Sequence, residues 1–170
     1  MSIIQGLHSF ASELQKESVP FAIIGGIAMF SYGSERTTFD VDFLVDGQYQ
    51  KKIKEIAKSL SLTLVNESAE FVQYTGSASI DVIFANRPLS QEMIKNSVKL
   101  ENFQYPVVRP EDLIGLKIQA YKGDKRREFV DKNDILTLMR LRPNLDYTEI
   151  KKYADIFGAW NEIEELKKRI

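Results

Sequence analysis

Three aspartates interrupt apolar stretches of this 170-residue sequence. Asp40 and Asp42 lie two apart in the stretch FDVDFLV, where the alternation of aspartate with apolar residues predicts a strand over residues 39–45. Both carboxylates then leave the same face of that strand, where like charges repel each other unless a cation lies between them. Aspartate is also a poor strand former, so two in one apolar strand indicate a functional role.

The third aspartate, Asp81, stands in the apolar stretch 80–85, which also predicts a strand. If this strand lies beside the one that carries Asp40 and Asp42, the three carboxylates converge. Mg²⁺ prefers one or two carboxylates together with phosphate oxygens, and metal ions held in this way stabilise both oxygens of a phosphoryl transfer. Asp81 would also be placed to accept a proton from an attacking hydroxyl.

A glycine pair, Gly25-Gly26, follows a short apolar run at residues 21–24 that predicts a buried strand. A helix is expected over residues 27–32, so the pair occupies a strand-to-helix junction. Without Cβ atoms, its backbone N–H groups can approach an anion, and the helix N-terminus adds partial positive charge. A tight turn alone explains such a pair equally well, but the aspartates downstream favour phosphate binding.

Together, Gly25, Gly26, Asp40, Asp42 and Asp81 resemble the motif of the DNA polymerase beta-type nucleotidyltransferase superfamily. The stretch 36–42 is similar to small bacterial members, the abortive-infection and toxin-antitoxin nucleotidyltransferases. The resemblance implies Mg²⁺-dependent transfer of a nucleotide from an NTP to a hydroxyl, with acceptors across the family that range from antibiotics to tRNA ends and proteins. Ile27 departs from the commoner pattern, which has serine after the glycine pair.

The predicted helix over residues 111–121 places Lys117 near the middle of a broad apolar arc, with Gly115 and Gln119 opposite. A buried lysine needs an anionic partner, either a carboxylate of the site or the triphosphate, although a lysine that extends to solvent is the alternative. The segment 109–135 also resembles the lysine-then-Asp-x-x-Asp helical motif of the toxin-like relatives. That resemblance implies that Lys117 binds phosphate and that Asp131 lies near the site.

Three further charged residues have competing interpretations. Arg36 is either a phosphate ligand or an ordinary surface arginine of a loop. Arg127 and Asp131 are four residues apart, so a helix-surface ion pair is an alternative to a site role for Asp131. For Asp134 we favour the surface interpretation.

The remaining pattern places these residues in one α+β domain, a mixed sheet followed by helices. We expect a single nucleotidyltransferase-like domain over residues 1–170, with a sheet-containing core at 1–108 and a helical part at 109–170. This is the minimal nucleotidyltransferase fold, a small mixed sheet flanked by helices. The predicted helices are near 3–14, 27–32, 48–60, 88–96, 111–121, 127–140, 147–157 and 160–168. The predicted strands are near 21–24, 39–45, 62–65, 71–74 and 80–85, with a short strand or extended segment near 103–108.

Composition narrows the class of protein. The net charge is −1, which argues against a long nucleic-acid polyanion as the main partner. The absence of cysteine excludes disulfides and thiolate metal sites. No apolar run is long enough to span a membrane, so we expect a cytoplasmic protein with no membrane partner. We expect Trp160 and the phenylalanines in the core rather than as stacking platforms.

These observations predict a nucleotidyltransferase that uses Asp40, Asp42 and Asp81 with Mg²⁺, and Gly25, Gly26, Arg36, Lys117 and Asp131 at the nucleotide. Its partners are an NTP and an acceptor on RNA or tRNA, a protein or a small molecule; a toxin-like enzyme would also have an antitoxin. The alternatives are an antibiotic-modifying transferase, a nucleotide-binding antitoxin or regulator without turnover, and an interaction module whose carboxylates are structural.

Overall fold

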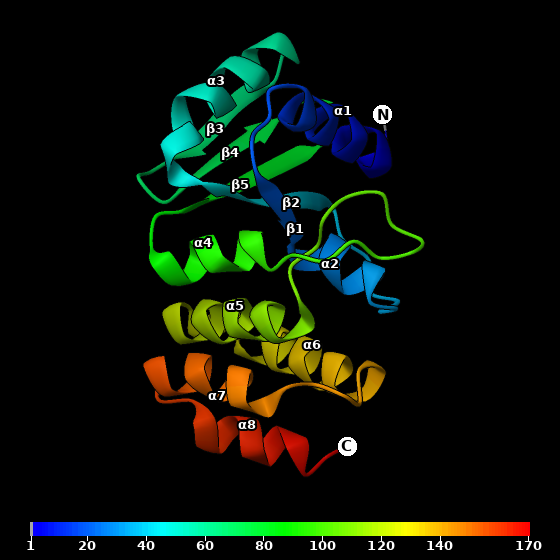
Figure 1. The fold of residues 1–170 in the computed structure, drawn as a ribbon, viewed down its shortest axis with the longest axis vertical. Coiled ribbons are helices and arrows are strands. Elements are labelled where there is room, and N and C mark those ends of the chain that lie inside the picture. The colour runs from blue at the N-terminus through cyan, green and yellow to red at the C-terminus, as the bar shows by residue number, and fades with distance from the viewer. Residues whose placement is uncertain (1) are drawn as a thin grey trace. The chain divides into compact units, whose positions relative to one another are not determined.

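The computed structural model describes residues 2–170, which divide into two compact units. The first unit contains the chain up to Ser31 together with Arg36–Val108, and the second contains Tyr32–Glu35 together with Arg109–Ile170. The sheet belongs to the first unit, and the second consists mainly of helices (Figure 1).

The sheet has five strands in the order β1-β2-β5-β4-β3. Strands β2 and β5 pair in parallel, and the three other pairs are antiparallel, so the sheet is mixed, as predicted. The parallel pair joins the two aspartate-bearing strands. The bounds are β1 Phe21–Ile24, β2 Asp40–Asp46, β3 Thr63–Glu67, β4 Phe71–Thr75 and β5 Ser79–Ala85.

Four helices accompany the sheet in the first unit: α1 Ile3–Lys16, α2 Gly25–Ser31, α3 Gln50–Ser59 and α4 Pro88–Lys95, with a short 3-10 turn at Gly47–Tyr49. Helix α1 begins at a capping box in which the side chain of Ser2 accepts from the backbone of Gln5, and that of Gln5 accepts from Ser2. Helices α1 and α3 lie together on one side of the sheet (Figure 1). There the rings of Phe10 and Phe43 are 5.0 Å apart and help to form the core.

The second unit stacks four helices, α5 Pro110–Gly123, α6 Glu128–Leu141, α7 Tyr147–Ile156 and α8 Trp160–Lys167, with a 3-10 turn at Lys125–Arg127. Helix α5 contacts α6 and α7, and α8 contacts the same two helices. Asp146 caps α7, because its side chain accepts from the backbone of Thr148 and Glu149. All four helices were predicted, with ends that differ by a few residues.

Residues 103–108, expected as a short strand or extended segment, form no named strand, and Val107 makes isolated bridges to Ile23 and Val98. One prediction about helix α5 was wrong. Gly115, expected opposite the apolar arc, is buried because α7 packs against it: a Cβ there would lie 2.5 Å from Cγ of Tyr153.

We had expected the phenylalanines to lie in the core, but only some of them do. Phe10 and Phe43 are fully buried, but Phe39 and Phe129 are 86% and 84% exposed, and Phe30 is 64% exposed. Phe39 is the residue immediately before β2, the strand that begins at Asp40. Its exposed ring is therefore next to Asp40 in the sequence.

None of the helices formed by residues 2–170 combines the length and apolar character needed to cross a membrane.

Candidate functional site

The three aspartates converge on one face of the sheet. The parallel register places Asp42 opposite Asp81 and Asp40 opposite Ser79. Because side chains alternate along a strand, Asp40, Asp42 and Asp81 point to the same face. One carboxylate oxygen from each residue lies within 4.8 Å of the others, and all three residues are partly buried. The predicted convergence is thus confirmed, and we name Asp40, Asp42 and Asp81 the carboxylate group.

Neutral side chains hold two members of the carboxylate group. The hydroxyl of Thr38 donates to Oδ1 of Asp40 at 2.7 Å. The side-chain amide of Gln73, on β4, donates to Oδ1 and Oδ2 of Asp81 at 3.0 and 3.3 Å. Gln73 is also the register partner of Asp81 across the β4–β5 pair. These hydrogen bonds fix the carboxylates without cancelling their charge.

Neither of these supporting residues, Thr38 and Gln73, was predicted from the sequence. Gln73 nevertheless carried a signal, because it is a polar residue inside a predicted strand, between Val72 and Tyr74, both of which are buried. This is the same interruption that singled out Asp81. Thr38 lies before the predicted strand, and the residues around it give no comparable indication of its role.

The environment of Asp81 favours its protonated form. Burial raises the pKa of its carboxyl, the hydrogen bond from Gln73 lowers that pKa in part, and the negative charge of Asp40 raises it further. Because the pKa of Asp81 is raised, its charged form is disfavoured in the folded protein, and a nearby positive charge would stabilise that form. A divalent cation would supply such a charge, and three carboxylates with converging oxygens are a suitable donor set for Mg²⁺.

The glycine pair lies directly against the carboxylate group. Gly25 has φ +63°, and a Cβ there would lie 1.9 Å from Oδ2 of Asp42. A Cβ on Gly26 would lie 2.5 Å from both Cβ and Oγ1 of Thr38. Gly25 therefore leaves room for a carboxylate, and Gly26 leaves room for the threonine that holds another. We had predicted the glycines for anion approach, and the structure adds this second reason for them.

Two neighbouring positions complete this part of the chain. Ile27, which stands where the resembling family commonly has serine, is a buried side chain of α2 and supplies no hydroxyl. Arg36 is exposed in the segment between α2 and β2.

Lys117 and Asp131 belong to the second unit, in a cluster of charges that we name the Lys117 ion cluster: Lys117, Arg127, Asp131 and Asp134. The side chain of Lys117 is 6% exposed, and its ammonium donates to Asp131 at 3.1 Å and to Asp134 at 2.6 Å. Arg127 donates to Asp131 at 2.9 Å. The expected anionic partner of Lys117 is thus a pair of carboxylates.

The burial of this cluster corrects one prediction. We had placed Asp134 on the helix surface, but it is only 2% exposed. The i,i+4 pair of Arg127 with Asp131 is present, and Asp131 itself is buried. The surface interpretation therefore fits Arg127, whose side chain is 53% exposed, but not the two aspartates.

A third buried carboxylate in the same unit, Asp112, was not predicted. Asp112 is fully buried, accepts two hydrogen bonds from Arg109 at 2.9 and 3.0 Å, and accepts another from the hydroxyl of Tyr153 at 2.6 Å. Burial raises the pKa of that hydroxyl, and the bond to Asp112 raises it further, so Tyr153 stays a neutral donor. Arg109, Asp112 and Tyr153 thus bond to one another, and this network joins α5 to α7.

Comparison with known proteins finds similar folds among solved structures but no match by sequence. No protein-family model and no curated protein matches the chain by sequence. Among solved structures, the antibiotic-resistance factor ANT(2'')-Ia has a TM-score of 0.67 at 14% identity, covering 96% of this chain and 95% of its own. That protein is also known in complex with adenylyl-2''-tobramycin.

Two further structures are similar. The lincosamide antibiotic adenylyltransferase LnuA, with lincomycin bound, has a TM-score of 0.60 at 13% identity, covering 81% of this chain and 96% of its own. An antigenic nucleotidyltransferase-like protein from Paracoccidioides brasiliensis has a TM-score of 0.58 at 19% identity, covering 98% and 92%. The carboxylate group is an acidic triad typical of metal-dependent nucleotidyltransferases. The chain therefore has the DNA polymerase beta-like nucleotidyltransferase fold.

Proposed function

We propose that the protein is a Mg²⁺-dependent nucleotidyltransferase that transfers a nucleoside monophosphate from an NTP to an acceptor hydroxyl. The observation that carries the proposal is the convergence of Asp40, Asp42 and Asp81 from two parallel strands, with one oxygen of each within 4.8 Å of the others. The similarity of the fold to adenylyltransferases supports it.

Asp40 and Asp42 would hold the metal ion, with Asp81 completing the site. Bound there, Mg²⁺ would neutralise charge on the triphosphate and on the oxygens of the reacting phosphate. The chain's own contribution is to hold its carboxylates in place: Thr38 orients Asp40, Gln73 orients Asp81, and the missing Cβ of Gly25 leaves space for Asp42.

In the proposed reaction the acceptor oxygen forms a bond to the α-phosphorus while the bond from that phosphorus to the β-bridging oxygen breaks, and pyrophosphate leaves. The proton of the acceptor hydroxyl passes to Asp81. Positioning and charge neutralisation supply most of the catalysis in such a transfer.

For the nucleotide, the proposal assigns the backbone of the Gly25-Gly26 turn and the side chain of Arg36 to phosphate. Lys117 and Asp131 remain predicted site residues on the strength of the resemblance. Since the ammonium of Lys117 already donates to Asp131 and Asp134, phosphate binding by Lys117 requires that at least one of these bonds be exchanged.

For the acceptor, the fold comparisons favour a small-molecule hydroxyl over the toxin-like acceptors. ANT(2'')-Ia and LnuA are an antibiotic-resistance factor and an antibiotic adenylyltransferase. We therefore place an antibiotic-like small molecule first, and an RNA, tRNA or protein acceptor, with an antitoxin as partner, second. Expression in a sensitive bacterium separates the two, because a drug-modifying enzyme protects the cells whereas a toxin-like enzyme slows their growth.

The direct test is calorimetric titration of the wild type with ATP, GTP, CTP and UTP, with and without Mg²⁺. The matched variant is Asp40→Asn/Asp42→Asn, which keeps the shape of both side chains and removes both charges. We expect Mg²⁺-dependent binding by the wild type, its loss in the variant, and release of pyrophosphate once an acceptor is supplied.

Other outcomes point to the alternatives. Nucleotide binding without release of pyrophosphate from the NTP, whichever acceptor is supplied, would indicate a nucleotide-binding regulator. Equal binding by the wild type and the double variant would leave the carboxylates a structural role and end the proposal. Circular dichroism of the variant provides the control for folding.

A further inference from the structure

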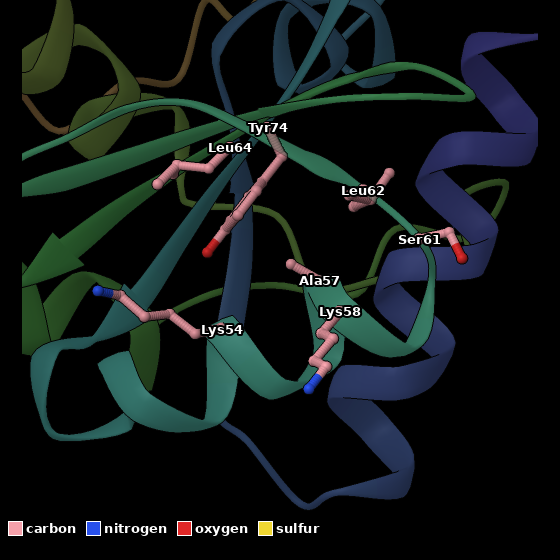
Figure 2. A pocket seen from close by; sticks show the side chains of 7 residues that line it. All are labelled: Lys54, Ala57, Lys58, Ser61, Leu62, Leu64 and Tyr74. Atoms are coloured by element: carbon pink, nitrogen blue, oxygen red, sulfur yellow. The ribbon is translucent and has the colours of Figure 1, made fainter.

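The first unit contains a cavity on the face of the sheet away from the carboxylate group. It lies between α3 and the β3–β4 strands and has a volume of about 390 Å³ (Figure 2). Tyr74, in its wall, follows Gln73 on β4, and Gln73 bonds to Asp81. Because side chains alternate, Tyr74 points to the opposite face. The lining residues are Lys54, Ala57, Lys58, Ser61, Leu62, Leu64 and Tyr74.

The hydroxyl of Tyr74 is the unusual feature of this cavity. The residue is 4% exposed, and its buried hydroxyl has no hydrogen-bond partner within the part of the chain that the structure describes. Figure 2 shows the side chain reaching from the sheet toward α3, beside Leu64. A buried hydroxyl is normally hydrogen-bonded, so this hydroxyl can still donate to a group that enters the cavity. Burial raises the pKa of the hydroxyl and the negative charge of Glu67 raises it further, which keeps Tyr74 a neutral donor.

Leu64 is the register partner of Tyr74 and also lines the cavity. Leu64 belongs to β3, the edge strand, and is 47% exposed. All five residues of β3 are exposed, so a change in the rotamer of Leu64 meets solvent rather than a packed core. An entering molecule can therefore displace Leu64 and reach Tyr74 without disturbing the sheet.

The charges around the cavity favour an anion. Lys54 and Lys58 are four residues apart on α3, so they lie on the same side of the helix. Lys54 pairs with Glu67 at 2.7 Å, whereas no ion pair is recorded for Lys58 with any residue from 2 to 170. One positive charge is left over at the rim of the cavity, beside apolar surface from Ala57 and Leu62.

We propose that this cavity binds a small aromatic anion, with its ring against Leu62 and Leu64, its acidic group toward Lys58, and an oxygen atom that accepts from the hydroxyl of Tyr74. The volume lies near the lower end of the range of about 300–1,000 Å³ that is usual for ligand sites, which suits a molecule of one or two rings. Carboxylates and phosphates share the required chemistry. The site is separate from the carboxylate group and does not depend on the proposed transferase activity.

The test is NMR titration of the methyl-labelled full chain with 2-naphthoate, with phenyl phosphate, and with neutral 2-naphthamide as the matched control. We expect saturable shifts of the Ala57, Leu62 and Leu64 methyls with both anions, and binding of the amide about tenfold weaker than that of naphthoate. Whichever anion binds more tightly identifies the preferred acidic group. Equal binding of the amide, or the absence of shifts at these methyls, would overturn the proposal.

Four variants sharpen the test. Lys58→Gln should weaken 2-naphthoate about tenfold, while Lys51→Gln, the same change on the same helix outside the cavity, should not. Tyr74→Phe should weaken binding without lowering the free energy of unfolding, because the lost hydroxyl has no partner. Asp42→Asn should leave binding unchanged. Equal losses in Lys58→Gln and Lys51→Gln, or a loss in Asp42→Asn, would contradict a site at this cavity.

Discussion

The carboxylate group and the Lys117 ion cluster both gather aspartates, but they treat charge in opposite ways. In the first, Asp40 and Asp81 accept hydrogen bonds from the neutral side chains of Thr38 and Gln73, and the oxygens of the three carboxylates converge. In the second, Asp131 and Asp134 are buried around the ammonium of Lys117.

The contrast lies in where the positive charge next to each set of aspartates comes from. Buried charge is tolerated where a partner of opposite sign lies within the fold, and removal of that partner is costly. Asp40 and Asp81, which are held by neutral donors, can gain instead from a cation that comes from outside. We therefore expect substitutions in the Lys117 ion cluster to act first on stability, and substitutions in the carboxylate group to act first on activity.

The largest expected effect is on stability. Lys117→Met keeps most of the side-chain volume but leaves Asp131 and Asp134 without their shared ammonium. It should lower the free energy of unfolding by about 3–5 kcal/mol, as measured by urea denaturation. The control, Lys151→Met, removes an exposed i,i+4 partner of Asp155 and should cost less than about 1 kcal/mol. Equal losses would remove the distinction between the buried cluster and a surface pair.

The next effect is on activity. Asp42→Asn removes a proposed metal ligand, so nucleotide transfer should fall more than about 100-fold, beyond the usual loss for residues that merely support a ligand. Its free energy of unfolding should fall by less than that of Lys117→Met, because Asp42 is only partly buried. A variant that loses stability and activity together would show that the two regions are not as different as their geometry indicates.

A smaller effect is expected at the supporting amide. Gln73→Leu removes the donor to Asp81 and should lower kcat about 10- to 100-fold. The bond from Gln73 lowers the pKa of Asp81, so its loss should raise that pKa and move the acidic limb of the kcat profile to higher pH. A merely structural role for Gln73 would leave the profile in place. Gln48→Leu, at an exposed position, is the control.

The smallest effect concerns pH and stability. The pKa of Asp81 is raised in the folded protein, so folding disfavours its charged form, and this contribution makes the protein less stable as pH rises from about 3.8 through the folded pKa. Asp81→Asn should abolish this decrease. At pH 7 in EDTA it should raise the free energy of unfolding by less than about 1 kcal/mol, because water screens a partly exposed carboxylate.

Urea titrations of this variant at pH 4 and pH 7 measure the effect, with Glu101→Gln at an exposed turn as the control. Saturating Mg²⁺ should raise the melting temperature of the wild type but not that of Asp81→Asn. Equal stabilisation of both proteins by Mg²⁺ would place the ion elsewhere.

Much of the fold followed from local sequence pattern. The strand at Phe21–Ile24, the glycine junction after it and the alternation around Asp40 and Asp42 were correctly predicted, because each depends on residues close together in the chain. The convergence of Asp81 with Asp42 was predicted only under the condition that their strands be neighbours. The strand order supplies that condition, and no periodicity within a strand encodes it.

The failures depend on contacts between distant elements. Gly115 was placed on the wrong side of its helix because Tyr153, far along the chain, packs where its Cβ would stand. Asp134 was assigned to the surface because its partner Lys117 lies on another helix. The expectation of a single domain over residues 1–170 and the roles assigned to the individual site residues remain predictions.

The parallel pairing of β2 with β5 also bears on how the protein folds. Helix α3 and the β3–β4 hairpin intervene in the chain between Asp42 and Asp81, yet the two residues are direct neighbours in the sheet. Contacts of such sequence separation form slowly, because a long loop must close before they are gained. A chain that ends before Ser79 has the glycine pair and two of the aspartates but lacks the third. During refolding or synthesis, the carboxylate group is therefore complete only when β5 has paired with β2 and the centre of the sheet has formed.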